Sequence, residues 1–266
     1  MTPHDIKEAG EALFRAEVER RQIGLLSLAY PDMNMDDAYA VQEAFVEKKR
    51  TVGGKVIGWK IGLTSKAMQN ALNIDIPDSG VLFEDMVFAN GGTIPKSRFI
   101  QPRVEAEIAF VMKKDLKGPG VTIEDVLAAT DHILPSLEIL DTRIKRVDSG
   151  TGKTRSVLDT IADNAANAGI VTSGQAIDPE AIDMRWLGAI VSRNDEVEET
   201  GLGAGVLNHP ALGIVWLTDR LAKYGHGLKA GEIVLSGSFI RPLEAPPGSE
   251  ISADFGSFGS VSCKFL

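Results

Sequence analysis

Apolar residues recur every three or four positions in two stretches near the N-terminus, which is the spacing of a helix that buries one face. Residues 3–28 have this pattern from Ile6 onward, and Pro3 suits the first turn of a helix. Residues 35–51 repeat the pattern, and two glycines follow them. The spacing therefore predicts a helical N-terminal portion over residues 1–54.

From Lys55 onward the chain changes to short apolar runs separated by Gly, Pro and Asp, a pattern typical of strands and turns. The runs that predict strands are VIGWKIGL (56–63), EIAFVM (107–112), MRWLGAIVSRN (184–194), EIVLSGSFI (232–240) and SVSCKFL (260–266). The segments that predict helices between them are TIEDVLAATDHI (122–133) and NHPALGIVWLTDRLAKYG (208–225). The predicted fold class is α+β, with a mixed, mostly antiparallel β domain over residues 55–266 that could close on itself.

Two glutamates stand two residues apart in the strand-like stretch QPRVEAEIAFVM (101–112). Because side chains alternate between the faces of a strand, Glu105 and Glu107 should point to the same face. Their charges repel each other, and burying one unpaired carboxylate costs several kcal/mol. A hard divalent cation such as Mg²⁺ or Mn²⁺ would remove the repulsion, since it prefers carboxylate oxygens. The alternative is an exposed strand face on which water solvates both carboxylates.

A third acid, Glu138, lies inside the apolar run ILPSLEILD (133–141). A charged residue among so many apolar neighbours needs a partner. Together with Glu105 and Glu107 it would form an open site of oxygen ligands, with the remaining positions left to water or substrate. The chain has four histidines and no two of them at ligand spacing, so the sequence does not predict a zinc site.

A lysine lies inside the predicted strand of residues 56–63, in the stretch GWKIGLTSK (58–66). Alternation places Lys60 on the same face as Gly58 and Gly62, which leaves space for a small ligand beside its amine. Lysine is disfavoured inside strands, and a lysine in a partly buried pocket can have its pKa lowered enough for proton transfer. The alternative is an edge-strand lysine that prevents aggregation.

The stretch DTIADNAANAG (159–169) holds four polar residues among small ones: Asp159, Asp163, Asn164 and Asn167. They could line a site, although helix capping and turn formation explain them almost as well. The glycine-rich motifs that bind nucleotide phosphates are absent from the sequence.

Composition and charge narrow the class of protein. The chain has 266 residues, of which 44% are hydrophobic, and a formal net charge of −9 without a Lys/Arg cluster. That charge argues against nucleic acid and anionic membranes as partners. No apolar run reaches the ~18 residues that span a bilayer, and the charged N-terminus lacks the apolar core of a signal peptide. With a single cysteine, Cys263, these features lead us to expect a cytoplasmic protein without an internal disulfide.

Five motifs in a fixed order carry a resemblance to a known family: GWKIGLTSKAMQ (58–69), IPDSGVLFEDM (76–86), QPRVEAEIAFVM (101–112), LPSLEILDTRI (134–144) and DTIADNAANAG (159–169). With them the sequence resembles the 2-oxo-alkenoate hydratase / 4-oxalocrotonate decarboxylase family, which belongs to the fumarylacetoacetate hydrolase superfamily. The last motif, together with GVLNHPALGIVWL (205–217) and SGSFIRP (236–242), is most similar to members that act on 2-oxohept-4-ene-1,7-dioate in homoprotocatechuate degradation.

The resemblance implies roles for five residues. Glu105, Glu107 and Glu138 match the family's metal-binding carboxylates, Lys60 matches its active-site lysine, and Asp78 matches an acidic residue near the substrate. We therefore expect Mg²⁺ or Mn²⁺ as the cofactor and Lys60 and Asp78 as the catalytic groups.

The resemblance also implies a fold and an activity. The fold is a mixed β-roll of the fumarylacetoacetate hydrolase C-terminal type with an N-terminal helical portion, assembled as a homo-oligomer. The activity is metal-dependent hydration of a 2-oxo-alkenoate, here 2-hydroxyhepta-2,4-diene-1,7-dioate to 4-hydroxy-2-oxoheptane-1,7-dioate. Hydration of 2-hydroxypenta-2,4-dienoate and decarboxylation of 4-oxalocrotonate are alternatives, and a non-catalytic small-acid binding protein is a more distant one. Ser79 departs from the family, where many relatives carry an aromatic residue.

A seven-carbon diacid has a second carboxylate that the metal cannot reach, and this carboxylate needs a cationic partner. By position, the candidates are Arg143, Arg155 and Arg241. We expect Arg241 to bind it, because that arginine follows a Gly/Ser turn in SGSFIRP. The alternative is that Arg241 lies on the surface next to Pro242.

Overall fold

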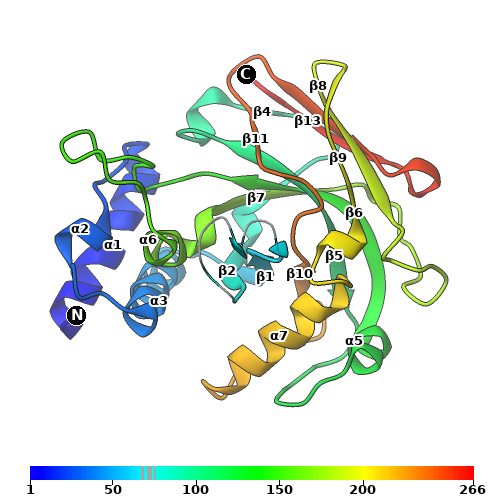
Figure 1. Ribbon diagram of the computed structural model, residues 1–266, viewed down its shortest axis with the longest axis horizontal. Coiled ribbons are helices and arrows are strands. Elements are labelled where there is room, and N and C mark those ends of the chain that lie inside the picture. Colours follow the sequence, from blue (N-terminus) through cyan, green and yellow to red (C-terminus); the bar gives the residue numbers. More distant parts are fainter. Residues whose placement is uncertain (67–68, 71–73, 75) are drawn as a thin grey trace.

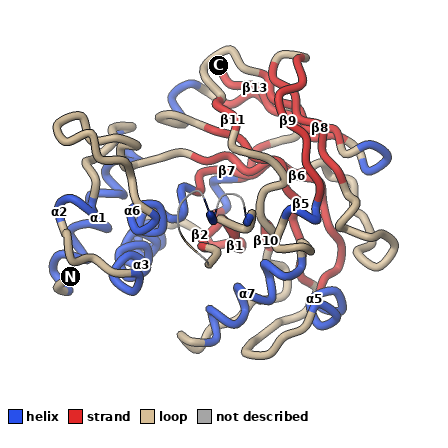
Figure 2. The backbone as a smooth tube through the Cα atoms, in the orientation of Figure 1, coloured by secondary structure: helices blue, strands red, loops and turns tan. Residues whose placement is uncertain are grey.

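The computed structural model describes residues 1–66, 69–70, 74 and 76–266. Its N-terminal helices gather on one side of the molecule and its strands on the other, as Figures 1 and 2 show. Of the motif at residues 58–69, Ala67 and Met68 lie outside the described residues. Within the described part of the chain, no helix combines the length and apolar character needed to cross a membrane.

The N-terminal helices are α1 (Pro3–Glu19), α2 (Leu26–Ala29) and α3 (Met35–Thr51). The prediction for residues 35–51 is confirmed, and Asn34 caps that helix. The prediction for residues 3–28 was too long, because Arg20 adopts a left-handed conformation (φ 54°) that ends α1. The chain then turns back, and Ile23 pairs with Ile144 next to the large sheet.

The larger sheet has the strand order β2-β1-β10-β5-β6-β7-β3, and β11 also pairs with β5. Its strands are β1 (Val56–Gly62), β2 (Asp78–Phe83), β3 (Val87–Phe88), β5 (Arg103–Met112), β6 (Thr130–Leu140), β7 (Asn167–Thr172), β10 (Ile233–Leu235) and β11 (Leu243–Glu244). Most neighbours are antiparallel, whereas β1 with β10 and β3 with β7 are parallel. The expected mixed, mostly antiparallel sheet is therefore confirmed.

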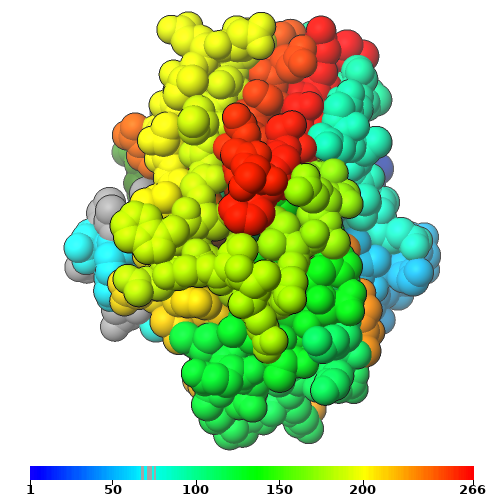
Figure 3. Space-filling model, turned by 90° about the vertical axis from the view of Figure 1, so that its right-hand side faces the viewer, coloured from blue at the N-terminus to red at the C-terminus, as the bar shows by residue number. Residues whose placement is uncertain are grey.

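A smaller sheet has the order β4-β13-β12-β8-β9. Its strands are β4 (Gly92–Ile94), β8 (Gly188–Arg193), β9 (Glu196–Leu202), β12 (Glu250–Asp254) and β13 (Ser260–Phe265). Figure 3 shows the C-terminal residues in red, between the segment of β8 and β9 and the earlier segment that contains β4. The two sheets enclose one hydrophobic cluster, and a second cluster joins the N-terminal helices to the larger sheet.

Three later helices cover the sheets: α5 (Ile123–Ala129), α6 (Val157–Ala162) and α7 (Ala211–Ala222). Helix α7 lies against β1 and α5, while α6 lies against α3 (Figure 1). The prediction over 122–133 was too long, because β6 begins at Thr130. The strand predicted over 232–240 ends at Leu235, because Gly237 (φ 117°) redirects the chain.

Candidate functional site

Strand pairing brings the three predicted glutamates together. Glu105 of β5 lies directly opposite Glu138 of β6, and Glu107 is two residues further along β5. Each of the three offers a carboxylate oxygen, and these oxygens all lie within 4.8 Å of one another. A cluster of hard oxygen ligands at this spacing can hold a divalent cation.

Two of the three carboxylates are shielded from water, so the alternative of a strand face on which water solvates both Glu105 and Glu107 is wrong, although Glu105 itself is partly exposed. Glu107 is 1% exposed and Glu138 is fully buried. Among the described residues, neither carboxylate oxygen of Glu138 has a hydrogen-bond partner, and the same is true of Glu107 Oε1. Glu107 Oε2 accepts a hydrogen bond of 2.9 Å from the Gly237 backbone N–H. Buried carboxylates with free oxygens are costly without a cation, and a divalent ion fits this donor set.

The electrostatics of the cluster lead to the same conclusion. Burial, reinforced by Glu138, raises the pKa of Glu105 to about 8. Burial also raises the pKa of Glu138 to about 7, although Lys60 opposes it, and the pKa of Glu107 lies well above its usual range. Without a cation the cluster therefore retains protons that a bound cation would displace.

Lys60 reaches the same cluster from a neighbouring strand. Because β1 lies between β2 and β10, the alternative of an edge-strand lysine is wrong. Its Nζ lies 3.4 Å from Glu138 Oε1, and the residue is 3% exposed. Burial lowers the pKa of Lys60, but Glu138 and Asp78 outweigh it and the pKa is raised. The lowered pKa considered from the sequence is therefore corrected, since the carboxylates hold the amine in its charged form.

Asp78 completes the group at the first residue of β2. It pairs with Gly62, where an added Cβ would lie only 2.3 Å from Asp78 Oδ1 and 2.9 Å from Lys60 Nζ. Gly62 thus leaves room for the carboxyl and the amine to approach each other. At Gly58 glycine is required for a different reason. A Cβ added there would collide with the Ile233 carbonyl of β10. Burial raises the pKa of Asp78, against the opposing effect of Lys60.

These groups border a cavity of about 270 Å³, at the small end of ligand pockets and suited to a metabolite of a few carbons. Lys60, Asp78 and Glu105 line it, with Glu107 and Glu138 in the adjoining cluster. Arg103 and Arg155 also line it. The sequence analysis missed Arg103, although strand alternation places it on the same face as Glu105.

One wall of the cavity comes from strained backbone. Asn164, Ala165 and Ala166 all have left-handed φ values between 51° and 59°, which cost alanine about 1–2 kcal/mol each. The Asn164 side chain holds both backbone groups of Val81 in β2, at 2.8 and 3.0 Å. The strain is thereby retained, and it places two small side chains, Ala165 and Ala166, against the cavity.

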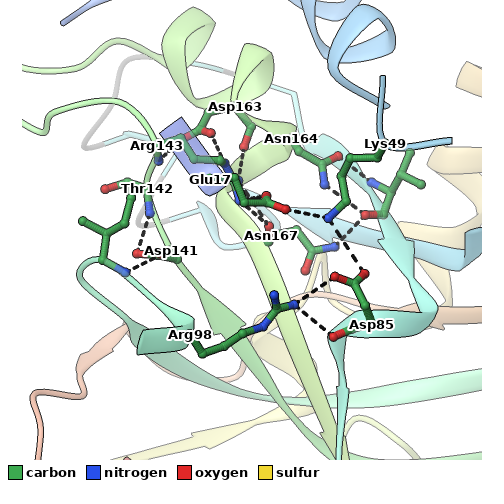
Figure 4. A network of polar contacts seen from close by, with 12 residues as sticks. Glu17, Lys49, Asp85, Arg98, Asp141, Thr142, Arg143, Asp163, Asn164 and Asn167 are labelled. Atoms are coloured by element: carbon green, nitrogen blue, oxygen red, sulfur yellow. Dashed lines mark hydrogen bonds and ion pairs between the residues drawn. The ribbon is translucent and has the colours of Figure 1, made fainter. Parts of the chain in front are cut away.

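A buried ionic network supports this wall from behind (Figure 4). Arg143 pairs with Asp163, donates 2.7 Å from Nη2 to the Asp163 carbonyl, and donates 3.1 Å from Nη1 to Glu17 of α1. Asp159 caps α6 together with Ser156. The polar residues of 159–169 are therefore used for capping and packing, which was the second of the two interpretations from the sequence.

The structure does not bring Arg241 to the cavity. Its side chain is 78% exposed and pairs with Glu199 at 2.5 Å. The neighbouring residues Ile240 and Pro242 line the cavity, so the arginine between them faces outward. The preference for Arg241 is therefore corrected in favour of the arginines that line the cavity.

Known proteins of similar sequence cover almost the whole chain. The chain is 49% identical over 256 residues to a 2-oxo-hept-4-ene-1,7-dioate hydratase of Escherichia coli, which covers 96% of each chain. It is 35% identical over 266 residues to a 4-oxalocrotonate decarboxylase of Pseudomonas sp. strain CF600, which covers 100% of this chain and 98% of the other. No protein-family model matches the chain.

Solved structures of two related proteins are also similar to this chain. A 4-oxalocrotonate decarboxylase from Pseudomonas putida G7, complexed with magnesium and adipate, superposes with a TM-score of 0.94 at 33% identity over 100% of this chain and 99% of the other. A 2-hydroxyhepta-2,4-diene-1,7-dioate isomerase from Mycobacterium marinum shares the fold, with a TM-score of 0.58 at 10% identity over 80% and 76%.

Proposed function

Because the chain belongs to the 2-oxo-alkenoate hydratase / 4-oxalocrotonate decarboxylase family, we propose that it is a metal-dependent hydro-lyase acting on a seven-carbon 2-oxo-alkenedioate. The reaction adds water to 2-oxohept-4-ene-1,7-dioate, in equilibrium with 2-hydroxyhepta-2,4-diene-1,7-dioate, and yields 4-hydroxy-2-oxoheptane-1,7-dioate. The observation that carries the proposal is that Lys60, Asp78 and Glu105 line one small cavity beside Glu107 and Glu138. The 49% identity to the E. coli hydratase supports the choice of substrate. It also supports a role for this chain in homoprotocatechuate degradation.

We assign Glu105, Glu107 and Glu138 as the ligands of a divalent cation, Mg²⁺ or Mn²⁺. The support is that Glu107 Oε1 and both carboxylate oxygens of Glu138 are buried without hydrogen-bond partners among the described residues, and that an all-carboxylate set suits hard cations. When bound there, such a cation supplies Lewis-acid polarisation of the 2-oxo group of the substrate.

We assign the proton transfers to Lys60 and Asp78. The charged Lys60 Nζ can donate a hydrogen bond, or a proton, to a substrate oxygen that gains negative charge. Asp78 Oδ1 is buried without a hydrogen-bond partner among the described residues, and the raised pKa of Asp78 lets it hold and release a proton. Proton transfer brings the double bond into conjugation with the keto group, water adds at C4, and a proton returns to C3.

Steady-state kinetics with three substrates test the proposed function. The metal-loaded protein should turn over 2-hydroxyhepta-2,4-diene-1,7-dioate with the highest kcat/KM, 2-hydroxypenta-2,4-dienoate with a lower value, and 4-oxalocrotonate with the lowest. The preference for the seven-carbon diacid over the five-carbon monoacid follows from the arginines that line the cavity. A highest kcat/KM for 4-oxalocrotonate would favour the decarboxylase alternative, and no turnover of any substrate would leave a small-acid binding protein.

We propose a homo-oligomer as the assembly. Ile190 of β8 and Val197 of β9 are exposed on one face of the smaller sheet, and Trp186, two residues before β8, is 72% exposed. Exposed apolar groups of this size commonly mark contacts between chains. Light scattering of the purified protein should give a mass well above the 28.5 kDa of one chain.

A further inference from the structure

The cavity is lined by groups of both charges. Glu105 and Asp78 line it, beside the rest of the carboxylate cluster. Arg103 and Arg155 also line it, and Arg146 lies close enough to influence the pKa of Arg155. A ligand in such a cavity can bind a cation at the carboxylates and present a second negative group to an arginine.

Two of these three arginines are already paired. Arg103 Nε donates to Glu244 Oε1 at 2.6 Å, and Arg146 Nη1 donates to the same oxygen at 2.7 Å. Arg146 Nη2 also donates to the Gln101 carbonyl at 3.1 Å. Both guanidinium groups therefore have a carboxylate partner within the protein, although one carboxylate balances only one of the two charges and Arg146 Nε has no hydrogen-bond partner among the described residues.

Arg155 is different. Its Nη1 is buried and has no hydrogen-bond partner among the described residues. The carboxylate nearest to it is Asp163 Oδ2, at 4.0 Å, and that oxygen already accepts a 2.8 Å hydrogen bond from the Arg143 backbone N–H. The Arg155 side chain is only 17% exposed, so water satisfies little of its guanidinium.

A guanidinium whose nearest carboxylate oxygen lies 4.0 Å away, in a partly closed cavity, favours a bound anion. Burial lowers the pKa of Arg155, Asp163 opposes this, and Arg146 lowers it further. A carboxylate from a ligand would supply the missing charge, and its two oxygens match the planar donors of arginine. The backbone N–H of Arg155 donates to the Arg146 carbonyl at 2.8 Å, which holds the residue in place beside the cavity.

We propose that Arg155 binds the second carboxylate of the substrate and thereby selects 2-oxo-alkenedioates over 2-oxo-alkenoates with an apolar end. This inference rests on the proposed function, which places the 2-oxo acid end of the substrate at the carboxylate cluster. Arg155 is a specificity-determining residue, and no bond to the reacting carbons depends on it.

The test compares Arg155→Met with Arg241→Met, a control that removes an exposed arginine near the same cavity. In Arg155→Met, kcat/KM for 2-hydroxyhepta-2,4-diene-1,7-dioate should fall by roughly 30- to 1,000-fold, the scale for removing one partner of a buried charge pair. Turnover of 2-hydroxypenta-2,4-dienoate should stay within about threefold, which also shows that the variant folds. Arg155→Lys should recover part of the lost kcat/KM for the diacid. Arg241→Met should leave kcat/KM unchanged for both substrates.

A binding measurement separates failure of this inference from failure of the proposed function. Calorimetry of the magnesium-loaded protein measures the binding of adipate, an unreactive diacid, and of hexanoate, its monoacid counterpart. The measurement needs no turnover. Arg155→Met should weaken the binding of adipate by a similar factor and leave the affinity for hexanoate unchanged. An equal effect of Arg155→Met on diacid and monoacid, or no effect on either, would overturn the role of Arg155 while leaving the hydratase activity intact. Selective loss of adipate binding in a protein without turnover would support Arg155 and refute the proposed function.

Discussion

A Lys60→Met enzyme is expected to lose about 10²- to 10⁴-fold in kcat with little change in KM, the range for removing a general acid–base group. Lys60 Nζ lies 3.4 Å from Glu138 Oε1 and lines the cavity with Asp78. Methionine keeps an unbranched side chain of similar length but has no charge and no proton to donate. The measurement is steady-state kinetics on the seven-carbon diacid at saturating metal.

The matched control for this variant is Lys49→Met. Lys49 is also a buried lysine, paired with Glu17 at 2.7 Å, but it belongs to the network between the helices and the sheet (Figure 4). Its loss should lower the free energy of unfolding and leave kcat nearly unchanged. Near wild-type kcat in Lys60→Met, or equal kcat losses in both variants, would rule out a catalytic role for Lys60.

Glu107→Gln is expected to weaken binding of Mg²⁺ or Mn²⁺ by at least ~100-fold, since even a residue behind the ligands typically contributes 10- to 100-fold. The variant removes one negative charge, while the amide oxygen can still accept the hydrogen bond that Gly237 donates to Glu107. Calorimetric titration of the metal-free protein measures the affinity directly.

Glu17→Gln is the control for charge removal elsewhere, because Glu17 pairs with Lys49 and Arg143 away from the cavity. Its metal affinity should match that of the wild type, although its stability should be lower. If Glu107→Gln binds metal as tightly as the wild type, the three glutamates are not the ligands.

Local patterns in the sequence indicated the members of the acidic cluster. Strand alternation placed Glu105 and Glu107 on one face, and the apolar surroundings of Glu138 indicated a buried acid that needs a partner. The same alternation placed Lys60 on one face with two glycines. The pairing of β5 with β6, which puts Glu105 opposite Glu138, joins distant residues and was not predicted from these patterns.

The features that the sequence did not reveal depend on contacts between distant residues. Arg241 is drawn to the surface by Glu199, 42 positions away, whereas Arg155 Nη1 stays 4.0 Å from Asp163, which pairs more closely with Arg143. No local pattern indicates which of several arginines finds a carboxylate. The raised pKa of Lys60 is of the same kind, since it results from acids on three other strands.

The ends of helices were likewise predicted correctly only where they depend on neighbouring residues. The start of α3 at residue 35 was predicted correctly from the apolar spacing, and the structure shows that Asn34 caps the helix there through a local hydrogen bond. The end of α1 at Glu19 depends instead on the left-handed Arg20, whose side chain donates to the Ser97 carbonyl at 2.9 Å. That contact joins residues 77 positions apart, so the helical spacing alone could not reveal it.

The most direct test of a metal-dependent hydratase is to identify the product formed from 2-hydroxyhepta-2,4-diene-1,7-dioate by mass spectrometry, with magnesium-loaded protein and with protein stripped by a chelator. The expected result is 4-hydroxy-2-oxoheptane-1,7-dioate, which keeps all seven carbons and gains one water, formed only by the loaded protein and again after magnesium is restored. Release of CO₂, or an unchanged rate of hydration after stripping, would contradict the assignment of this chain as a hydratase whose three glutamates hold a catalytic cation.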